Sequence, residues 1–329
     1  MPKTIAVLID HADYPAGGYE SQLRTGFEAT CKRLDLKLLL FFGRALDAPM
    51  YQAQNAVYHL AHPDCVDGII LVAPGLGTYT GAEGVRALSK RLEHLPQVSL
   101  GLEIPGVPSV IIDNRPGIHA LVDHLVEVHK CRSIAYIGGP EHNPDAVVRA
   151  QAFEDALLHH GLPINPDRCQ AGAFTLPSGS SAMATILERG EYFDSVLAAN
   201  DGMALGAIET LKARGFRVPH QVRVVGFDDL EIARLVNPPL TTVRQPLGEM
   251  ATRAVELLLA RNQRLDGAVA HAPRRRNRVP PFLRLFAASE RNGAALDDGE
   301  QASRRRGGRA RRAPGRARRE SPRRRRSGP

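Results

Sequence analysis

The chain has 329 residues, of which 43% are hydrophobic, so it is long enough for two ordinary domains with cores of their own. Its formal net charge is +8, but residues 261–329 hold 21 Arg against 6 acidic residues, whereas residues 1–260 hold 22 basic and 29 acidic ones. The acidic body therefore excludes an extended polyanion-binding surface, and we expect residues 291–329, rich in Arg, Gly, Pro and Ser, to be disordered.

The cysteines and the first residues exclude further classes. Four cysteines are scattered without a C-x-x-C pair, which favours reduced, mostly buried thiols over a zinc site, and no metal or other cofactor is expected. The apolar run before Asp10 is too short for a signal-peptide core, and no stretch approaches the ~18 apolar residues of a membrane span. We therefore expect a cytoplasmic protein.

Short apolar runs alternate with stretches of helical period along the chain. Strands are predicted at residues 4–9, 36–42, 68–73, 109–112, 133–138, 194–199, 222–227 and 240–243. Helical spacing starts at Leu23 and again at Ile118, and further helices are predicted at residues 148–157, 183–187, 203–211 and 247–258. This βαβα alternation predicts an α/β fold with parallel sheets covered by helices on both faces.

So many strands predict two doubly wound lobes rather than one sheet. We expect residues 1–113 and 242–262 to form the N-terminal lobe, and residues 114–241 the C-terminal lobe, with residues 279–290 as a candidate addition. Open parallel sheets bind ligands beyond the carboxyl ends of their strands, so two facing lobes make a ligand cleft. The segments that cross between the lobes are expected to act as hinges.

Polar side chains stand at the carboxyl ends of two predicted strands. Asn200 ends one strand, where its amide can meet a ligand hydroxyl as donor or acceptor, and Asp201 is a candidate N-cap of the next helix. Asp228 follows the next strand as the expected acceptor for vicinal hydroxyls, while Asp229 caps the turn or helix that follows. A glycosidase with paired carboxylates is the competing interpretation, but adjacent side chains point in different directions.

Catalytic motifs are absent from the sequence. There is no H-E-x-x-H arrangement among the histidines, no G-x-S-x-G and no Walker lysine. We therefore expect a binding protein and not an enzyme.

Four segments carry a set of motifs: 133–140 (SIAYIGGP), 196–206 (VLAANDGMALG), 224–229 (VVGFDD) and 238–246 (PPLTTVRQP). Each is weak alone, but the set at these intervals is specific. Together they resemble the ligand-sensing core of the lactose-repressor/galactose-repressor (LacI/GalR) family of transcriptional regulators, which shares its fold with periplasmic sugar-binding proteins. The resemblance covers about residues 4–260.

The resemblance implies ligand contacts in the C-terminal lobe. It implies that Asn200 contacts the ligand and that the planar fork of Arg149 reaches ligand oxygens, although a solvated helix Arg is the alternative. Phe174 matches a position where the family offers an aromatic face to a sugar or base ring, and a core Phe is the alternative. Asn143, in the loop before Arg149, is a further candidate.

In the N-terminal lobe, the loop that follows the first strand is expected to overhang the cleft. It holds Asp13, a candidate ligand residue, and it ends at Tyr19, which falls where the family has a ring-contacting residue. Gly17 and Gly18 are turn residues, since a G-x-G-x-x-G fingerprint is absent.

The resemblance implies a sensor of a small effector, a sugar or a nucleoside or purine, that regulates transcription by lobe closure and forms a homodimer. Family members begin with a helix-turn-helix headpiece, whereas this chain reaches its first strand at Thr4. DNA binding is therefore expected only through a headpiece absent from this chain, or weakly through the Arg-rich tail.

Besides the absent headpiece, a second departure from the family leaves other interpretations open. The family's last strand is only faintly echoed at residues 281–290. The alternatives are an exported solute-binding protein of a sugar ABC transporter and the sensor domain of a truncated signalling kinase or cyclase.

Overall fold

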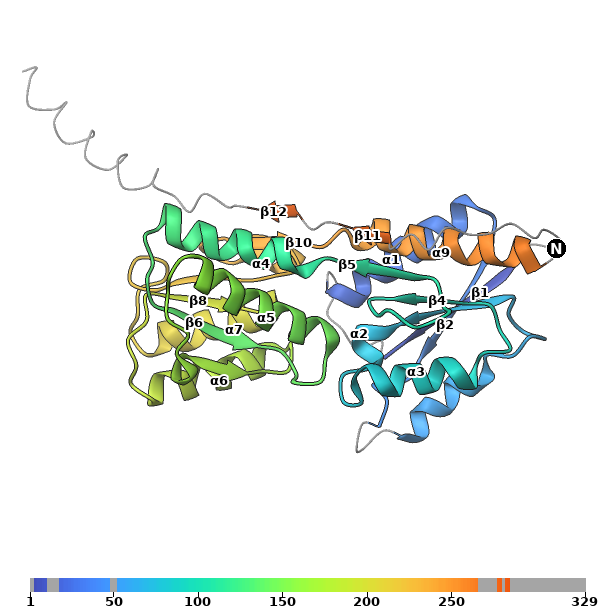
Figure 1. Ribbon diagram of the computed structural model, residues 1–329, viewed down its shortest axis with the longest axis horizontal. Coiled ribbons are helices and arrows are strands. Elements are labelled where there is room, and N and C mark those ends of the chain that lie inside the picture. The colour runs from blue at the N-terminus through green and yellow to red at the C-terminus, as the bar shows by residue number, and fades with distance from the viewer. Residues whose placement is uncertain (1–2, 11–17, 48–51, 266–276, 280–281, 285–329) are drawn as a thin grey trace, which may run out of the picture. The chain divides into compact units, whose positions relative to one another are not determined.

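Two parallel sheets, each flanked by helices, organise the protein (Figure 1). All residues that the computed structural model describes lie within one compact unit, Met1–Phe286. They are residues 3–10, 18–47, 52–265, 277–279 and 282–284. The predicted tail, residues 291–329, lies outside the described residues.

The first sheet has six strands in the order β11-β5-β4-β3-β1-β2, and every neighbouring pair is parallel. The strands are β1 (Thr4–Ile9), β2 (Lys37–Phe42), β3 (Gly68–Val72), β4 (Gln97–Leu100), β5 (Ser109–Ile112) and β11 (Asn277–Val279). Every residue of β3 is buried. Such a continuous apolar run is what a strand needs when helices cover both faces of its sheet.

Alternate residues of β1 enter two separate cores on the two faces of this sheet. Ile5 and Val7 pack in a cluster with α1 (Tyr19–Arg33) and α9 (Leu247–Leu265). Ala6 and Leu8 pack in another with the 3-10 segment η1 (Gln52–Leu60), α2 (Ala73–Leu76) and α3 (Gly81–Arg91). The period of two along a strand thus explains why one short sequence supplies both cores.

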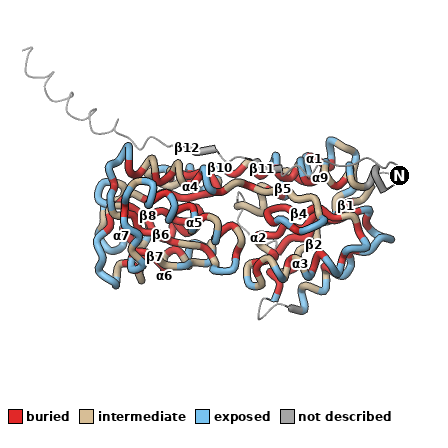
Figure 2. Tube along the Cα trace, in the orientation of Figure 1, coloured by how far each residue is buried: buried red, intermediate tan, exposed pale blue. Residues whose placement is uncertain are grey.

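The second sheet has four parallel strands in the order β7-β6-β8-β9. They are β6 (Ile134–Gly138), β7 (Cys169–Ala171), β8 (Ser195–Ala198) and β9 (Arg223–Val225). Its helices are α4 (Asn114–Asp123), which continues in the π-helical turn η2 (His124–Val128), α5 (Pro144–His159), α6 (Leu176–Glu188), α7 (Asp201–Ala213) and α8 (Glu231–Leu235). A short 3-10 turn, η3 (Pro166–Arg168), precedes β7. One continuous core joins β6, β8 and β9 to the helices around them, and β6 and β8 are its most buried strands (Figure 2).

The chain passes more than once between the two sheets. It leaves the first sheet after β5, and it returns through β10 (Thr242–Arg244) to α9. A third passage joins β11, in the first sheet, to β12 (Phe282–Arg284), which pairs antiparallel with β10. The end of β9 therefore lies beside the returning segment, where bridges join Val225 to Thr241 and Asp228 to Arg244.

The predicted strands are all present, with no end shifted by more than two residues. The sequence prediction missed β4, β7, η1 and α3. In β4 the polar residues Gln97 and Ser99 alternate with apolar ones, yet all four residues are buried. Gln97 is satisfied by a hydrogen bond from the Ser89 hydroxyl to its Oε1 at 2.7 Å and by donating its Nε2 to the Ser89 carbonyl at 2.8 Å.

None of the helices in the described part of the chain is long and apolar enough to cross a membrane.

Candidate functional site

A buried guanidinium lies at the carboxyl ends of the strands of the second sheet. Arg149, in the second turn of α5, is only 3% exposed. Its Nε donates to Asn114 Oδ1 at 3.0 Å and its Nη1 to the Ala199 carbonyl at 2.6 Å. The guanidinium carbon lies 4.0 Å from the centroid of the Phe227 ring. Arg149 thus joins α4, α5 and the ends of β8 and β9 in one cluster.

The carboxyl group of Asp228 faces this guanidinium. Asp228 Oδ1 lies 3.5 Å from Arg149 Nη1, and it accepts a hydrogen bond from Gln245 Nε2 at 2.6 Å. Burial raises the pKa of Asp228 from 3.8 to about 6, although Arg149 and Gln245 act in the opposite direction. The free-energy cost of removing this carboxylate from water therefore exceeds the stabilisation of its charge by Arg149 and Gln245.

Two more carboxyl groups are buried nearby. Asp145 accepts from Asn114 Nδ2 at 2.8 Å, and burial raises its pKa while Arg149 lowers it. Asp201 accepts from the Thr242 hydroxyl and from a backbone N–H. Burial first, and then the charge of Asp228, raise the pKa of Asp201 well above its ordinary value. The cluster holds more buried carboxyl groups than cations, which favours ligands that donate hydrogen bonds to it.

Aromatic rings border the polar groups. The Phe174 centroid lies 5.9 Å from the guanidinium carbon of Arg149, and Phe174 has a φ of 60°. Its ring packs against Gly139, where a Cβ atom would overlap it. The pKa of Tyr19 is raised by burial and then by the charges of Asp145, Glu20 and Asp228. The Tyr19 hydroxyl from α1 is therefore in electrostatic reach of the cluster on the second sheet.

The two predicted asparagines act as helix caps in the structure. Asn200 Oδ1 accepts from Met203 N at 2.9 Å at the start of α7, and its Nδ2 donates to the Phe174 carbonyl at 2.9 Å. The prediction that Asp201 caps this helix is therefore wrong, because Asn200 is the N-cap and Asp201 is the first helical residue. Asn143 Oδ1 caps α5, and its Nδ2 donates to the Pro74 carbonyl at 2.9 Å. Asn143 thus connects the second sheet's helix to the end of β3.

Asp229 has another role than the predicted cap. Its Oδ2 accepts from Arg234 Nη2 at 3.2 Å and from Arg244 Nε at 2.5 Å. The residue before α8, Leu230, provides no side-chain cap. The two neighbouring carboxylates therefore diverge, with Asp228 facing Arg149 and Asp229 facing α8 and β10.

The structure brings most of the predicted ligand residues together. Arg149, Asp228 and Phe174 form one cluster, and Tyr19 is in electrostatic reach of it. Asn200 is joined to the cluster through the neighbouring carbonyl that accepts from Arg149 and through its own bond to the Phe174 carbonyl. Asn143 stands at the start of the helix that carries Arg149. Asp13 lies outside the described residues.

The sequence prediction missed four residues of this cluster: Asn114, Asp145, Phe227 and Gln245. Gln245 is the most informative, because its Oε1 is buried and has no hydrogen-bond partner among the described residues. A buried acceptor of this kind suits a ligand hydroxyl or N–H. Gln245 directly follows the observed strand β10, but it lies two residues beyond the predicted end at residue 243, which hid the signal that Asn200 and Asp228 gave.

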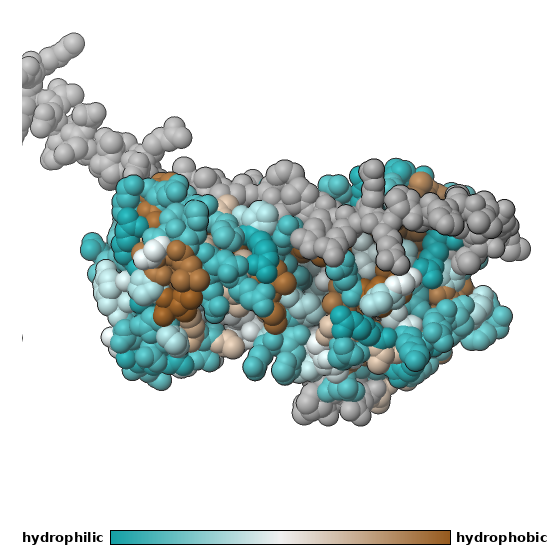
Figure 3. All heavy atoms as spheres, viewed as in Figure 1, coloured by the Kyte–Doolittle hydropathy of each residue, from teal (hydrophilic) through white to brown (hydrophobic). Residues whose placement is uncertain are grey.

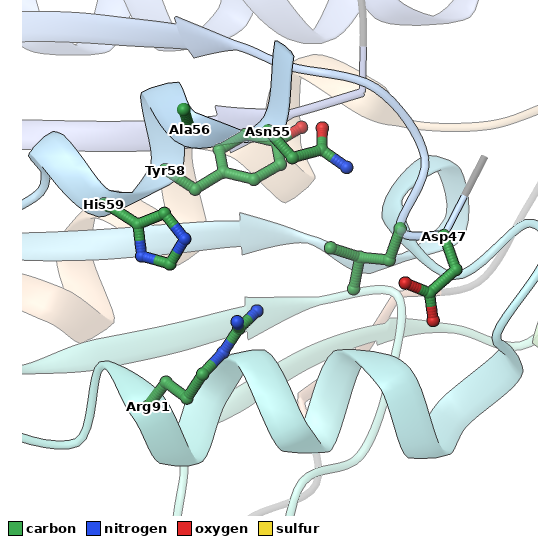
Figure 4. A pocket seen from close by; sticks show the side chains of 7 residues that line it. Asp47, Asn55, Ala56, Tyr58, His59 and Arg91 are labelled. Atoms are coloured by element: carbon green, nitrogen blue, oxygen red, sulfur yellow. The ribbon is translucent and has the colours of Figure 1, made fainter. Parts of the chain in front are cut away.

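A separate hollow of about 310 Å³ lies on the first sheet's side of the protein (Figure 4). It is lined by Leu46, Asp47, Asn55, Ala56, Tyr58, His59 and Arg91. His59 on η1 and Arg91 on α3 point toward each other across it. Asn55 Oδ1 is occupied by Arg44 N at 2.7 Å, and the Tyr58 hydroxyl donates to the Ile9 carbonyl at 2.7 Å. Its lining shares no residue with the Arg149 cluster.

Within the described ranges, no group of three or more His, Cys, Asp or Glu side chains is arranged to hold a metal ion. The Arg149 cluster offers hydrogen-bond donors, hydrogen-bond acceptors and an aromatic ring. It can bind a neutral, hydroxyl-rich or amide-bearing ring through directed hydrogen bonds and aromatic contact.

Comparison with known proteins assigns part of the chain to a family of domains. Residues 122–284 match the family of periplasmic binding protein-like domains. Among solved structures, the "transcriptional regulator CelR-cellobiose complex" superposes with a TM-score of 0.74 at 26% identity, covering 87% of this chain and 84% of that one. The predicted two-sheet, periplasmic binding protein-like fold is therefore confirmed, and residues 122–284 are a domain of this family.

The particular relatives are regulators of the LacI/GalR type. The "HTH-type transcriptional repressor CytR" of Escherichia coli (strain K12) is 33% identical over 201 residues, which are 60% of this chain and 57% of CytR. The "HTH-type transcriptional regulator GalR" of the same strain is 35% identical over 176 residues, 53% of this chain and 51% of GalR. The chain thus spans somewhat more than half the length of these relatives. They confirm the resemblance that the four motifs indicated.

Proposed function

We propose that this chain is the effector-binding part of a transcriptional regulator and that its effector is a sugar or a nucleoside. The buried Arg149–Asp228 pair at the strand ends, with an unpartnered Gln245 acceptor beside it, carries the proposal. The relatives support the regulatory role, since they are transcriptional repressors and regulators and not enzymes.

The chemistry of the cluster favours this ligand class. Asp228 and Gln245 Oε1 accept hydrogen bonds, whereas Arg149 and Tyr19 donate them. Phe174 provides a half-buried ring beside these groups, which suits the apolar face of a pyranose or a base. CelR, the relative solved with cellobiose, makes β-linked disaccharides part of the ligand panel.

We infer that binding closes two lobes, one of residues 1–113 with 242–262 and one of residues 114–241. The two sheets and their separate cores support this division. The bond from Asn143 Nδ2 to the Pro74 carbonyl joins residues of the two proposed lobes. A ligand shifts the balance between open and closed forms only by its differential affinity for them. A protein contact that exists in only one of the two forms, as we propose for this hydrogen bond, contributes to the same balance.

We also propose that the chain forms a homodimer. Figure 3 shows apolar side chains gathered on the surface over α5. In α5, Val147 is 40% and Leu158 63% exposed. Covering such side chains in a symmetric interface would remove apolar surface from water. Sedimentation velocity at micromolar concentration tests this, and a monomer at every concentration would contradict it.

A thermal-shift screen tests the ligand assignment. The panel contains pentoses, hexoses, cellobiose, nucleosides and purine bases, and a ligand that binds only the folded protein raises the melting temperature. We expect Asp228→Asn to lose the shift, because the variant lacks the carboxylate. The matched control is Asp155→Asn, which removes an exposed carboxylate paired with Arg115 and should keep the full shift. A full shift in Asp228→Asn would refute the site assignment.

A further inference from the structure

Two histidines meet at the end of α4, far along the helix from the residues of the Arg149 cluster. α4 continues into the π-helical turn His124–Val128, and the His129 N–H donates to the His124 carbonyl at 3.4 Å. Residues five apart in an α-helix are rotated by about 140° and do not face each other. The wider π turn turns His129 toward the side that carries His124, and single π turns often occur at functional sites.

The two imidazole rings meet at their outer nitrogens. The Nε2 atoms of His124 and His129 share a hydrogen bond at 3.2 Å, which a bound metal ion would replace, and the rings are T-shaped with centroids 4.7 Å apart. Metal–nitrogen bonds to histidine are about 2.0–2.1 Å long, so an ion bound by both atoms would subtend an N–metal–N angle of roughly 100°. This angle lies between the octahedral and tetrahedral values.

We propose that His124 and His129 form a two-histidine site for a divalent first-row transition metal, such as Zn²⁺ or Ni²⁺, whose remaining positions are filled by water. Imidazole is a preferred ligand for these ions. The His pair is separate from the effector site, so the proposal does not depend on the proposed function.

Two charged side chains close to the pair in sequence bond to other groups. The Lys130 ammonium is held by the Glu127 carbonyl at 2.6 Å, and Asp123 Oδ1 is occupied by His160 Nε2 at 2.7 Å.

The second ring nitrogen limits the affinity. His124 Nδ1 is buried and makes no hydrogen bond within the described residues. When Nε2 binds a metal, the ring proton must sit on Nδ1 without a partner, whereas metal-binding histidines usually donate this proton. The site is therefore weaker than one with supported ligands.

Titration calorimetry of the untagged full-length chain with NiCl₂ and ZnCl₂ at pH 7.5 tests the site. The variants are His124→Gln and His129→Gln. The matched control is the double variant His62→Gln/His94→Gln, a pair whose ring centroids are 6.2 Å apart. We expect each single variant of the proposed site to weaken Ni²⁺ binding at least tenfold and the control to bind like the wild type.

Wild-type Ni²⁺ affinity in both His124→Gln and His129→Gln would overturn the proposal, as would equal loss in the control. The absence of any saturable binding to the wild type would also overturn it. Urea midpoints of the two variants show whether the fold is kept. His129 is exposed, so His129→Gln keeps the test valid if His124→Gln alone proves unstable.

Discussion

Replacing Asp228 by Asn is expected to stabilise the unliganded protein while removing ligand binding. Asp228 is only 4% exposed, and its pKa rises from 3.8 to about 6 despite Arg149 and Gln245. Because this rise already includes the attraction to both partners, it measures a net cost of the buried charge. A rise of this size corresponds to about 3 kcal/mol at pH values above both pKa values.

The protonation of the Asp228 carboxyl group in the folded and unfolded chain decides whether its charge lowers or raises the free energy of unfolding. Below pH 3.8 it is protonated in both the folded and the unfolded chain, so it costs nothing. As the pH rises, the unfolded chain ionises first, and the cost grows until it is complete above about pH 6. Asn carries no charge at any pH. Asp228→Asn should therefore gain up to about 3 kcal/mol at pH 7.5 and about half of that at pH 5.

Urea unfolding of both proteins at the two pH values measures the difference. Arg149 keeps its bonds to Asn114 and to the Ala199 carbonyl in the variant, which is why its own desolvation should not cancel the gain. The control Asp155→Asn should change stability by less than about 1 kcal/mol, because exposed ion pairs contribute little. A variant less stable than the wild type at pH 7.5 would show that the ion pair outweighs burial, contrary to our reasoning.

Three further changes test other parts of the structure. Asn143→Ser keeps a cap oxygen for α5, but the shorter side chain cannot reach the Pro74 carbonyl. Calorimetry should show ligand affinity reduced about fivefold, which is the value of one hydrogen bond. Unchanged affinity would show that this bond does not contribute to closure of the lobes. Gly206→Ala places a Cβ against the Leu176 carbonyl, and urea unfolding should show a loss of about 1–3 kcal/mol; a neutral result would contradict the close packing of α6 and α7. Tyr136→Phe removes a buried hydroxyl without a partner in the described residues, and its melting temperature should not fall; a clear decrease would reveal a missing partner.

Sequence periodicity located strands where burial and apolar composition coincide. β3 is an unbroken apolar run, and β8 is also buried throughout, so both were predictable. β4 was not, because its buried polar residues depend on Ser89, a partner in α3 that no local pattern reveals. β7 has only three residues, too few for a periodic signal.

The candidate site was predictable where polar residues end predicted strands. This rule, with the family resemblance, located Asp228 and Arg149. The rule could not reveal that the Asn200 amide accepts from Met203 N and donates to the Phe174 carbonyl. Asn suits both a helix cap and a ligand contact, so the residue type alone does not distinguish the two roles. The contact between Arg149 and Asn114 was also hidden, since it joins residues 35 positions apart on two helices.

A crystal structure with the ligand found in the thermal-shift screen tests the central claim most directly. We expect ligand oxygen or nitrogen atoms within hydrogen-bond distance of Arg149, Asp228 and Gln245, with a ring against Phe174. A ligand bound elsewhere, such as in the hollow between His59 and Arg91, with the Arg149 cluster unchanged, would contradict it.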